Sequence, residues 1–159
     1  MLTMKKTFLL LLLSMIGTEL LAQYKGQYRA QYGNDYMFGA GLFGMNFSGE
    51  YFPFEKISFA PNVSILFPAT GKASNLHLDT RYYFTEEKVE FYGLLGYANY
   101  RRRYEFNPEI TYQNTGTLNI GGGILYKLID ELGVNAEVKL QPQNRNEFII
   151  KVGLSYFIN

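Results

Sequence analysis

The sequence predicts an all-β protein, a single antiparallel up-and-down barrel of eight strands preceded by a cleaved signal peptide. Three observations support this fold class. Apolar and polar residues alternate with a period of two through eight separate segments, which is the period of a strand that presents two different faces. Residues typical of turns, mostly Gly, Pro, Asn and Asp, fill the gaps between these segments. Eight is an even number, as a closed antiparallel barrel of this kind requires.

The composition of the 159 residues excludes several classes of site. One domain of average size fits this length. The chain has no Cys and one His, His77, so a disulfide framework, a thiol nucleophile and a multi-His metal site are excluded. We therefore expect neither a metal nor a cofactor. A formal net charge of +1 argues against a nucleic-acid partner, which needs a basic surface.

The N-terminus has the features of a secretory signal peptide. Lys5 and Lys6 precede an apolar run at residues 8–16, and Ala22 is the small residue before the expected cleavage site. As a helix this run would extend about 14 Å, too short for a hydrocarbon core of about 30 Å. We expect a signal peptide at residues 1–22 and one barrel domain at residues 23–159.

The eight predicted strands, in chain order, are residues 24–32, 36–52, 57–67, 76–84, 89–103, 117–128, 132–141 and 147–157. In the first four, the apolar face is rich in aromatic residues. It is formed by Tyr24, Tyr28, Ala30 and Tyr32, then Phe43, Met45, Phe47 and Tyr51, then Ile57, Phe59, Val63 and Ile65, then Leu76, Leu78, Tyr82 and Phe84.

The last four strands have an apolar face with more aliphatic residues. It is formed by Phe91, Leu95 and Tyr97, then Leu118, Ile120, Ile124 and Tyr126, then Leu132, Val134, Ala136, Val138 and Leu140, then Ile150, Val152, Leu154 and Tyr156. The seventh strand shows the clearest alternation, with Glu137 and Lys139 on its opposite face.

The predicted turns lie at residues 33–35, 53–56, 68–75, 85–88, 104–116, 129–131 and 142–146. Apart from the first, short and long turns alternate, which indicates long loops on one rim of the barrel and tight turns on the other. The longest, residues 104–116, carries Phe106, Ile110 and Tyr112. These side chains could bind a surface partner, or could fold back over the barrel as a cap.

The apolar face is expected to point outward. The interior of an eight-stranded barrel is only wide enough for side chains, and the Phe, Tyr and Leu residues of this face are bulky. Aromatic residues also gather at strand ends, as in the girdles at membrane interfaces. The alternative is a secreted soluble barrel whose apolar face lines a cavity for a small apolar ligand.

Three segments, 57–62, 76–84 and 92–97, resemble those of the small OmpA/OmpX-type and opacity-type outer-membrane barrels. The segment 151–159, with a polar residue, a glycine and then the aromatic Tyr156 and Phe157, is similar to the C-terminal signal that the barrel assembly machinery recognises. The resemblance implies a monomeric transmembrane barrel in contact with outer-membrane lipids and lipopolysaccharide. It also implies a structural or surface-interaction role and includes no catalytic signature.

An outward apolar face leaves the polar face to fill the barrel. The charged residues on this face are Lys25, Arg29, Glu50, Asp79, Arg81, Glu90, Glu137, Lys139, Glu147 and Lys151. Five are basic and five acidic, and buried charges need partners. We expect an ion-pair network that plugs the barrel; the alternative is a pore lined by charges.

Two further groups of residues suggest sites. Arg101 and Arg103 lie near the far end of the fifth strand, on the same face as Tyr97. Guanidinium groups bind phosphate bidentately. We expect the two arginines to contact lipopolysaccharide phosphates, with Tyr97 and Tyr100 packing nearby; the alternative is a solvated cluster.

Some of the barrels that the chain resembles are lipid A-modifying enzymes that use a His with a Ser or an acid. The resemblance therefore implies this activity as a second function, with His77, Ser74 and Asp79 as the candidate residues, although no nucleophile motif surrounds Ser74.

Overall fold

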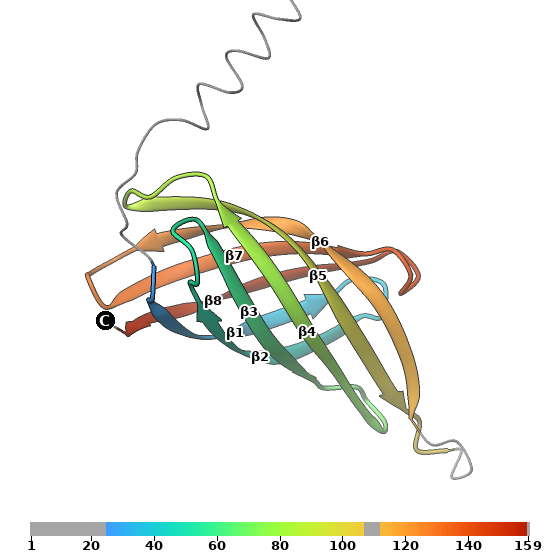
Figure 1. Cartoon of the computed structure of the whole chain (residues 1–159). Helices are drawn as coiled ribbons and strands as arrows, with labels where there is room; N and C mark the ends of the chain where they lie inside the picture. Colours follow the sequence, from blue (N-terminus) through green and yellow to red (C-terminus); the bar gives the residue numbers. More distant parts are fainter. Residues whose placement is uncertain (1–24, 107–111, 159) are drawn as a thin grey trace, which may run out of the picture.

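The computed structural model describes residues 25–106 and 112–158, which form a closed β-barrel (Figure 1). The predicted signal peptide, together with Tyr24 and Ile110, lies outside the described residues. The strands are β1 (Tyr28–Met37), β2 (Leu42–Tyr51), β3 (Ile57–Leu66), β4 (Lys72–Tyr83), β5 (Val89–Arg103), β6 (Gln113–Lys127), β7 (Leu132–Gln141) and β8 (Glu147–Ile158). Among the described residues, no helix is long and apolar enough to traverse a lipid bilayer.

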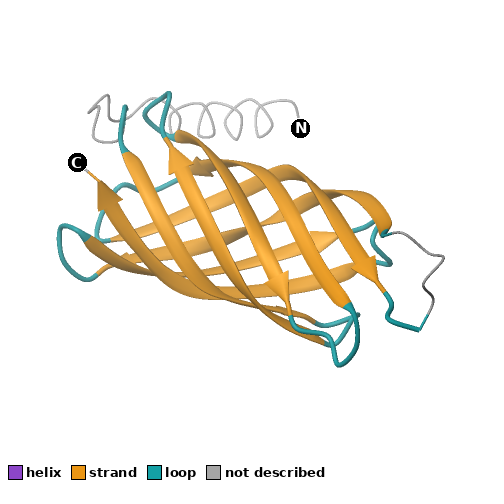
Figure 2. Ribbon diagram, turned by 90° about the horizontal axis from the view of Figure 1, so that it is seen from below, coloured by secondary structure: helices purple, strands orange, loops and turns teal. Residues whose placement is uncertain are grey.

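Each strand pairs antiparallel with its neighbours in the chain, and β1 pairs with β8 to close the barrel. Figure 2 shows the strands inclined to the long axis of the barrel. The predicted eight-stranded antiparallel up-and-down barrel is therefore confirmed. We call the rim where β1 begins and β8 ends the terminal rim, and the opposite one the distal rim.

The outer surface of the barrel is apolar and its interior is mostly polar. Along β2, for example, Phe43, Met45 and Phe47 are exposed, whereas the intervening Asn46 and Ser48 are buried. All strands show this alternation. Because the interior holds charged and amide side chains rather than an apolar lining, the structure contradicts the alternative of a soluble barrel around an apolar ligand.

Four strands have boundaries that differ from the prediction. β3, β5, β7 and β8 agree within one residue, but β4 and β6 each begin four residues earlier than expected. β1 begins four residues later and ends five residues later than expected, and β2 begins six residues later. The connecting segments are 38–41, 52–56, 67–71, 84–88, 104–112, 128–131 and 142–146. All but 104–112 have four or five residues, so the predicted alternation of long and short loops is wrong.

The predicted turn at residues 33–35 is also wrong, because these residues continue β1. A Cβ on Gly33 would lie 2.6 Å from the Val152 carbonyl oxygen, so glycine here permits close approach of β8 rather than a turn. The Asp35 carboxylate is buried, where it accepts hydrogen bonds from the Ser64 hydroxyl and the Asn46 amide. Interior partners therefore override the turn propensity of Asn and Asp.

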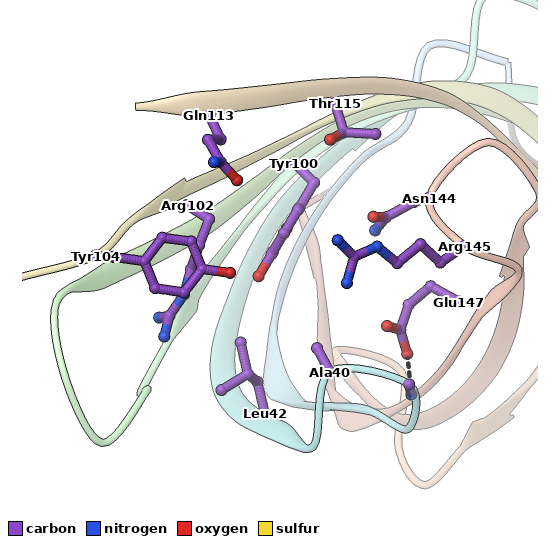
Figure 3. A pocket seen from close by; sticks show the side chains of 11 residues that line it. Ala40, Leu42, Tyr100, Arg102, Tyr104, Gln113, Thr115, Asn144, Arg145 and Glu147 are labelled. Atoms are coloured by element: carbon purple, nitrogen blue, oxygen red, sulfur yellow. Dashed lines mark hydrogen bonds between the residues drawn. The ribbon is translucent and has the colours of Figure 1, made fainter. Parts of the chain in front are cut away.

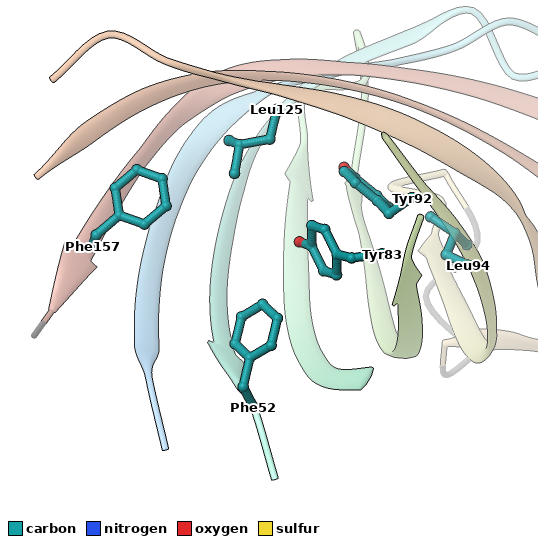
Figure 4. Packing of buried hydrophobic residues seen from close by; sticks show 6 residues of the cluster. All are labelled: Phe52, Tyr83, Tyr92, Leu94, Leu125 and Phe157. Atoms are coloured by element: carbon teal, nitrogen blue, oxygen red, sulfur yellow. The ribbon is translucent and has the colours of Figure 1, made fainter. Parts of the chain in front are cut away.

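Buried apolar side chains occupy both ends of the interior. Phe52, Tyr83, Tyr92, Leu94, Leu125 and Phe157 form the terminal cluster, in which side chains from several strands point toward one another (Figure 4). Met37, Leu42, Leu66, Ala73 and Ile149, with the partly buried Tyr100, form the distal cluster. The polar network is therefore enclosed between two apolar layers.

We expect Gly121→Ala to destabilise the barrel because a Cβ at this position would overlap the Val138 carbonyl oxygen of β7. The steric cost of forcing atoms into a well-packed site is about 1–3 kcal/mol. Urea unfolding in detergent micelles, followed by circular dichroism, measures it. Gly49→Ala is the matched control, since no atom lies within 4 Å of a Cβ there. Equal midpoints for the two variants would contradict the close β6–β7 approach.

Candidate functional site

The interior is organised around Arg81, which is fully buried. Its guanidinium contacts the Glu137 carboxylate at 2.6 Å and the Glu50 carboxylate at 3.1 Å. Arg81 belongs to β4, Glu137 to β7 and Glu50 to β2, so the network crosses the barrel from one wall to another. A bidentate guanidinium is suited to such bridging because its donors are held in a fixed planar arrangement.

The Glu50 carboxylate also accepts hydrogen bonds from uncharged side chains. Glu50 accepts hydrogen bonds from Ser58 at 2.5 Å, Tyr83 at 2.7 Å and Gln31 at 3.0 Å. These bonds satisfy the lone pairs that burial removes from water, which is the condition for a buried ion pair to be tolerated.

Glu137 links the centre of the network to its distal half. It accepts a hydrogen bond from Tyr92 at 2.8 Å and lies 3.1 Å from the Lys139 ammonium. Lys139 in turn contacts Asp79 at 2.7 Å. Arg81, Glu137, Lys139 and Asp79 thus form a continuous chain of alternating charge.

A second ion-pair group lies near the terminal rim. Arg29 contacts Glu90 at 2.9 Å, and Glu90 is also 2.6 Å from Lys127. The Arg29 guanidinium lies 4.5 Å from the Phe52 ring centroid and 4.8 Å from that of Phe157. The terminal cluster therefore supplies cation–π contacts to a buried charge as well as apolar packing.

His77 belongs to an amide and hydroxyl network on the distal side of the centre. Its Nε2 lies 3.3 Å from the Ser64 hydroxyl and its Nδ1 lies 2.9 Å from the Asn119 amide nitrogen. Ser74 lies within β4, not in a loop as expected, and its parity is that of the outward Leu76. The two side chains therefore leave opposite faces of the sheet and cannot act as a nucleophile and its base.

The structure brings together most of the predicted interior residues. Arg29, Glu50, Asp79, Arg81, Glu90, Glu137, Lys139 and Lys151 are all buried. Lys151 is 3.5 Å from Gln31 and makes no ion pair within 4 Å to the described residues. Two other charges of the polar face lie elsewhere: Lys25 is exposed, and Glu147 lies near the distal rim, where it accepts a hydrogen bond from the Gly39 amide at 2.5 Å.

Sequence reasoning missed three contributors to the interior. Asp35 lies in the segment 33–35 predicted as a turn, and Lys127 and Tyr83 are not among the residues expected to form the network. The alternation of polar and apolar residues places these three side chains on the inward face of their strands. It does not indicate which inward side chains meet across the barrel. No group of three or more His, Asp or Glu side chains in the described ranges could hold a metal ion.

The arginines near the distal rim lie on the outer surface. Arg101, Arg103 and Tyr97 are all exposed and share one face of β5. The expectation that Tyr100 packs beside them is wrong, because Tyr100 has the opposite parity and packs against the distal cluster inside the barrel. The Arg101 Nε donates to the Asn99 side chain at 3.3 Å, and the Arg103 guanidinium lies 6.0 Å from the Tyr112 ring centroid. Two guanidinium groups two residues apart on a strand thus face the same surroundings.

We expect Glu137→Ala to destabilise the barrel by about 3–5 kcal/mol, because it leaves buried cations with too few partners. Urea unfolding in detergent micelles measures the change. Lys56→Ala serves as the control, since the Lys56–Glu86 pair is longer, at 3.9 Å, and partly exposed, and such pairs contribute about 1 kcal/mol or less. A loss for Glu137→Ala no larger than for Lys56→Ala would contradict the central position of Glu137.

No family model and no curated protein sequence matches the chain. Solved structures do match. The N-terminal β-barrel domain of Pseudomonas aeruginosa OprF is 18% identical with a TM-score of 0.73, over 86% of this chain and 100% of that chain. P. aeruginosa OprG is 12% identical with a TM-score of 0.65, over 86% of this chain and 97% of that chain.

A third similar structure is Ail, the attachment invasion locus protein of Yersinia pestis, in complex with the heparin analogue sucrose octasulfate. It is 13% identical with a TM-score of 0.64, over 84% of this chain and 99% of that chain. At these identities the likeness concerns architecture. The chain has the fold of the small eight-stranded outer-membrane β-barrels, as the resemblance implied.

Proposed function

We propose that this chain is an integral outer-membrane protein with a structural or surface-interaction role. The observation that carries the proposal is the apolar outer surface, which runs around the whole closed barrel. It includes Phe47, Val63, Leu78, Leu95, Ile120, Val138 and Val152, all exposed. Soluble monomers rarely expose contiguous apolar patches of more than a few hundred Å², so a lipid environment accounts for this surface.

The backbone is suited to the same environment. Unpaired backbone amides and carbonyls are costly in hydrocarbon, and a closed barrel pairs them all between neighbouring strands. Closure also removes the edge strands through which sheets associate, which supports a monomer. We further propose that residues 1–22 are removed on export and that the barrel assembly machinery recognises β8.

The interior supports a plugged barrel rather than a channel. The ion-pair network lies between the terminal and distal clusters, and its central side chains, including Arg81, Glu50 and Glu137, are buried. A lipid A-modifying activity has no support in this geometry, because the one His faces the interior while Ser74 faces outward.

Exposed aromatic residues near the distal rim support the surface-interaction role. Phe106 is 85% exposed, and Tyr104 and Tyr112 are also exposed, in the segment 104–112 between β5 and β6. Exposed aromatic side chains on a loop held by a rigid scaffold are typical of binding surfaces.

We also propose that Arg101 and Arg103, with Tyr97 beside them, contact lipopolysaccharide phosphates from the outer face of β5.

We expect Leu95→Arg to destabilise the barrel in lipid vesicles by about 2–4 kcal/mol, because Leu95 lies midway along β5 on the outer surface. Urea unfolding in vesicles measures the change. Phe54→Arg is the control, since Phe54 is exposed in the connection at the terminal rim. There the expected cost is about 0–1 kcal/mol. Equal, small effects would contradict a membrane-spanning barrel.

We expect the Arg101→Ala, Arg103→Ala double variant to carry less lipopolysaccharide through purification, because it lacks both outward guanidinium groups. The bound lipopolysaccharide is quantified per mole of folded protein, with detergent sensitivity of the cells as a second measurement. Lys88→Ala, a basic residue at the terminal rim, is the control. Unchanged lipopolysaccharide in the double variant would refute this contact while leaving the barrel assignment intact.

A further inference from the structure

A polar cleft opens at the distal rim, inside the mouth of the barrel (Figure 3). Its volume is about 360 Å³, within the range of small-ligand sites. Four parts of the chain line it: the β1–β2 connection, the end of β5, the start of β6 and the β7–β8 connection. The cleft is separate from Arg101 and Arg103, which lie on the outer face of the same rim.

The cleft is closed at its inner end. Tyr100 and Leu42 line it and also belong to, or pack against, the distal cluster. Arg102 shares the inward parity of Tyr100 on β5. The cleft is therefore a blind vestibule, and a molecule entering it would meet an apolar floor rather than a passage through the barrel.

Two guanidinium groups in the cleft have no carboxylate partner. Neither Arg102 nor Arg145 makes an ion pair within 4 Å to the residues that the structure describes. The Arg102 Nη1 atom is buried and has no hydrogen-bond partner among residues 25–106 and 112–158, and the Arg102 guanidinium lies over the Tyr104 ring at 4.7 Å. A buried, unpartnered guanidinium nitrogen is costly and indicates that something else accepts its hydrogen bond.

The Glu147 carboxylate in the same cleft is already engaged. Its Oε1 accepts the hydrogen bond from the Gly39 amide, drawn as a dashed line in Figure 3. Among the described residues, the charged side chains that line the cleft are Arg102, Arg145 and Glu147, and together they carry a net positive charge. An anion can therefore enter it without displacing an existing ion pair.

The hairpin turn between β7 and β8 determines where the Arg145 side chain lies. The φ of Arg145 is +55°, in the left-handed region that non-glycine residues other than Asn and Asp rarely adopt. Figure 3 shows the Arg145 side chain extending from the β7–β8 connection into the cleft toward Tyr100. Asn146 also has a positive φ, +52°, and the Glu147 amide donates to the Asn144 carbonyl. Arg145 and Asn146 are therefore the two central residues of a tight hairpin turn. This turn directs the Arg145 side chain into the cleft.

We propose that this cleft binds a small anionic ligand, the phosphate or sulfate ester of a sugar. Arg102 and Arg145 provide bidentate donors for a tetrahedral oxyanion. Tyr100 and Tyr104 provide ring surfaces for the apolar face of a sugar, and Gln113, Thr115 and Asn144 provide partners for its hydroxyl groups. The site goes beyond the proposed membrane role, since neither the apolar outer surface nor the ion-pair network requires it.

The test uses the mature chain folded in a non-ionic detergent, titrated with glucose 6-phosphate, glucose and inorganic phosphate by isothermal calorimetry. We expect saturable binding of glucose 6-phosphate and at least tenfold weaker binding of glucose. Equal binding of glucose and glucose 6-phosphate would overturn the proposal. Because the measurement is made in detergent, its failure does not bear on the outer-membrane location.

Variants assign the binding to the cleft. Arg102→Gln should weaken glucose 6-phosphate binding at least tenfold, whereas Lys72→Gln, which removes an exposed charge from the same rim outside the cleft, should leave it unchanged. Equal losses in the two variants would show non-specific attraction and overturn the proposal. A gel-mobility shift on heating verifies that each variant is folded.

Arg145→Asn separates binding from structure. Asn tolerates the left-handed backbone better than Arg, so we expect the thermal stability to be unchanged or raised while the affinity for glucose 6-phosphate falls at least fivefold. Lower stability with unchanged affinity would overturn the proposal.

Lipid A added to the micelles identifies the source of the phosphate. Displacement of the sugar phosphate indicates a lipid headgroup, and no displacement indicates a soluble sugar. Each result is consistent with an oxyanion site.

Discussion

The structure depends on the narrowness of a barrel closed by eight strands. Such a cylinder has room inside for side chains only, so the inward charges must find their partners among the other inward side chains. Arg81 illustrates the consequence, because its guanidinium reaches Glu50 from β2 and Glu137 from β7. Buried pairs of this kind contribute little net stability. Their effect is to define which side chains face inward and how neighbouring strands are aligned, since a slip of one residue would place these charges in lipid.

The fold was predictable because the period of two runs almost unbroken through the chain. Once the strands were placed, parity assigned Phe47 to the outside and Asn46 to the inside without further information. Prediction failed where local turn propensity competed with pairing. Gly33 and Asp35 have the composition of a turn, yet β1 continues through them, because Gly33 allows close approach of β8 and Asp35 has partners inside. Both reasons are long-range, and no local pattern contains them.

The candidate sites were predictable to a smaller extent. Parity identifies the inward charges but not their height along the barrel, so it could not pair Arg29 with Glu90, which lie 61 residues apart in sequence. The same limit explains why the sequence does not predict a site at Arg102. Its neighbours Arg101 and Arg103 face outward, and one step of the strand places Arg102 in the mouth. There it lines the same cleft as Arg145, which comes from a connection more than forty residues later. Only the closure of the barrel brings them to one cleft.

The apolar layers at the two ends explain how one small barrel can hold a dense charge network and still offer a binding surface. The terminal cluster covers the Arg29 end of the network with aromatic rings, and the distal cluster covers the other end. Water is thereby kept from the ion pairs, which strengthens them. The distal cluster also forms the floor of the mouth cleft, so the arginines there are isolated from the interior carboxylates that would otherwise neutralise them. The layer that closes the barrel is therefore the same layer that leaves its mouth positively charged.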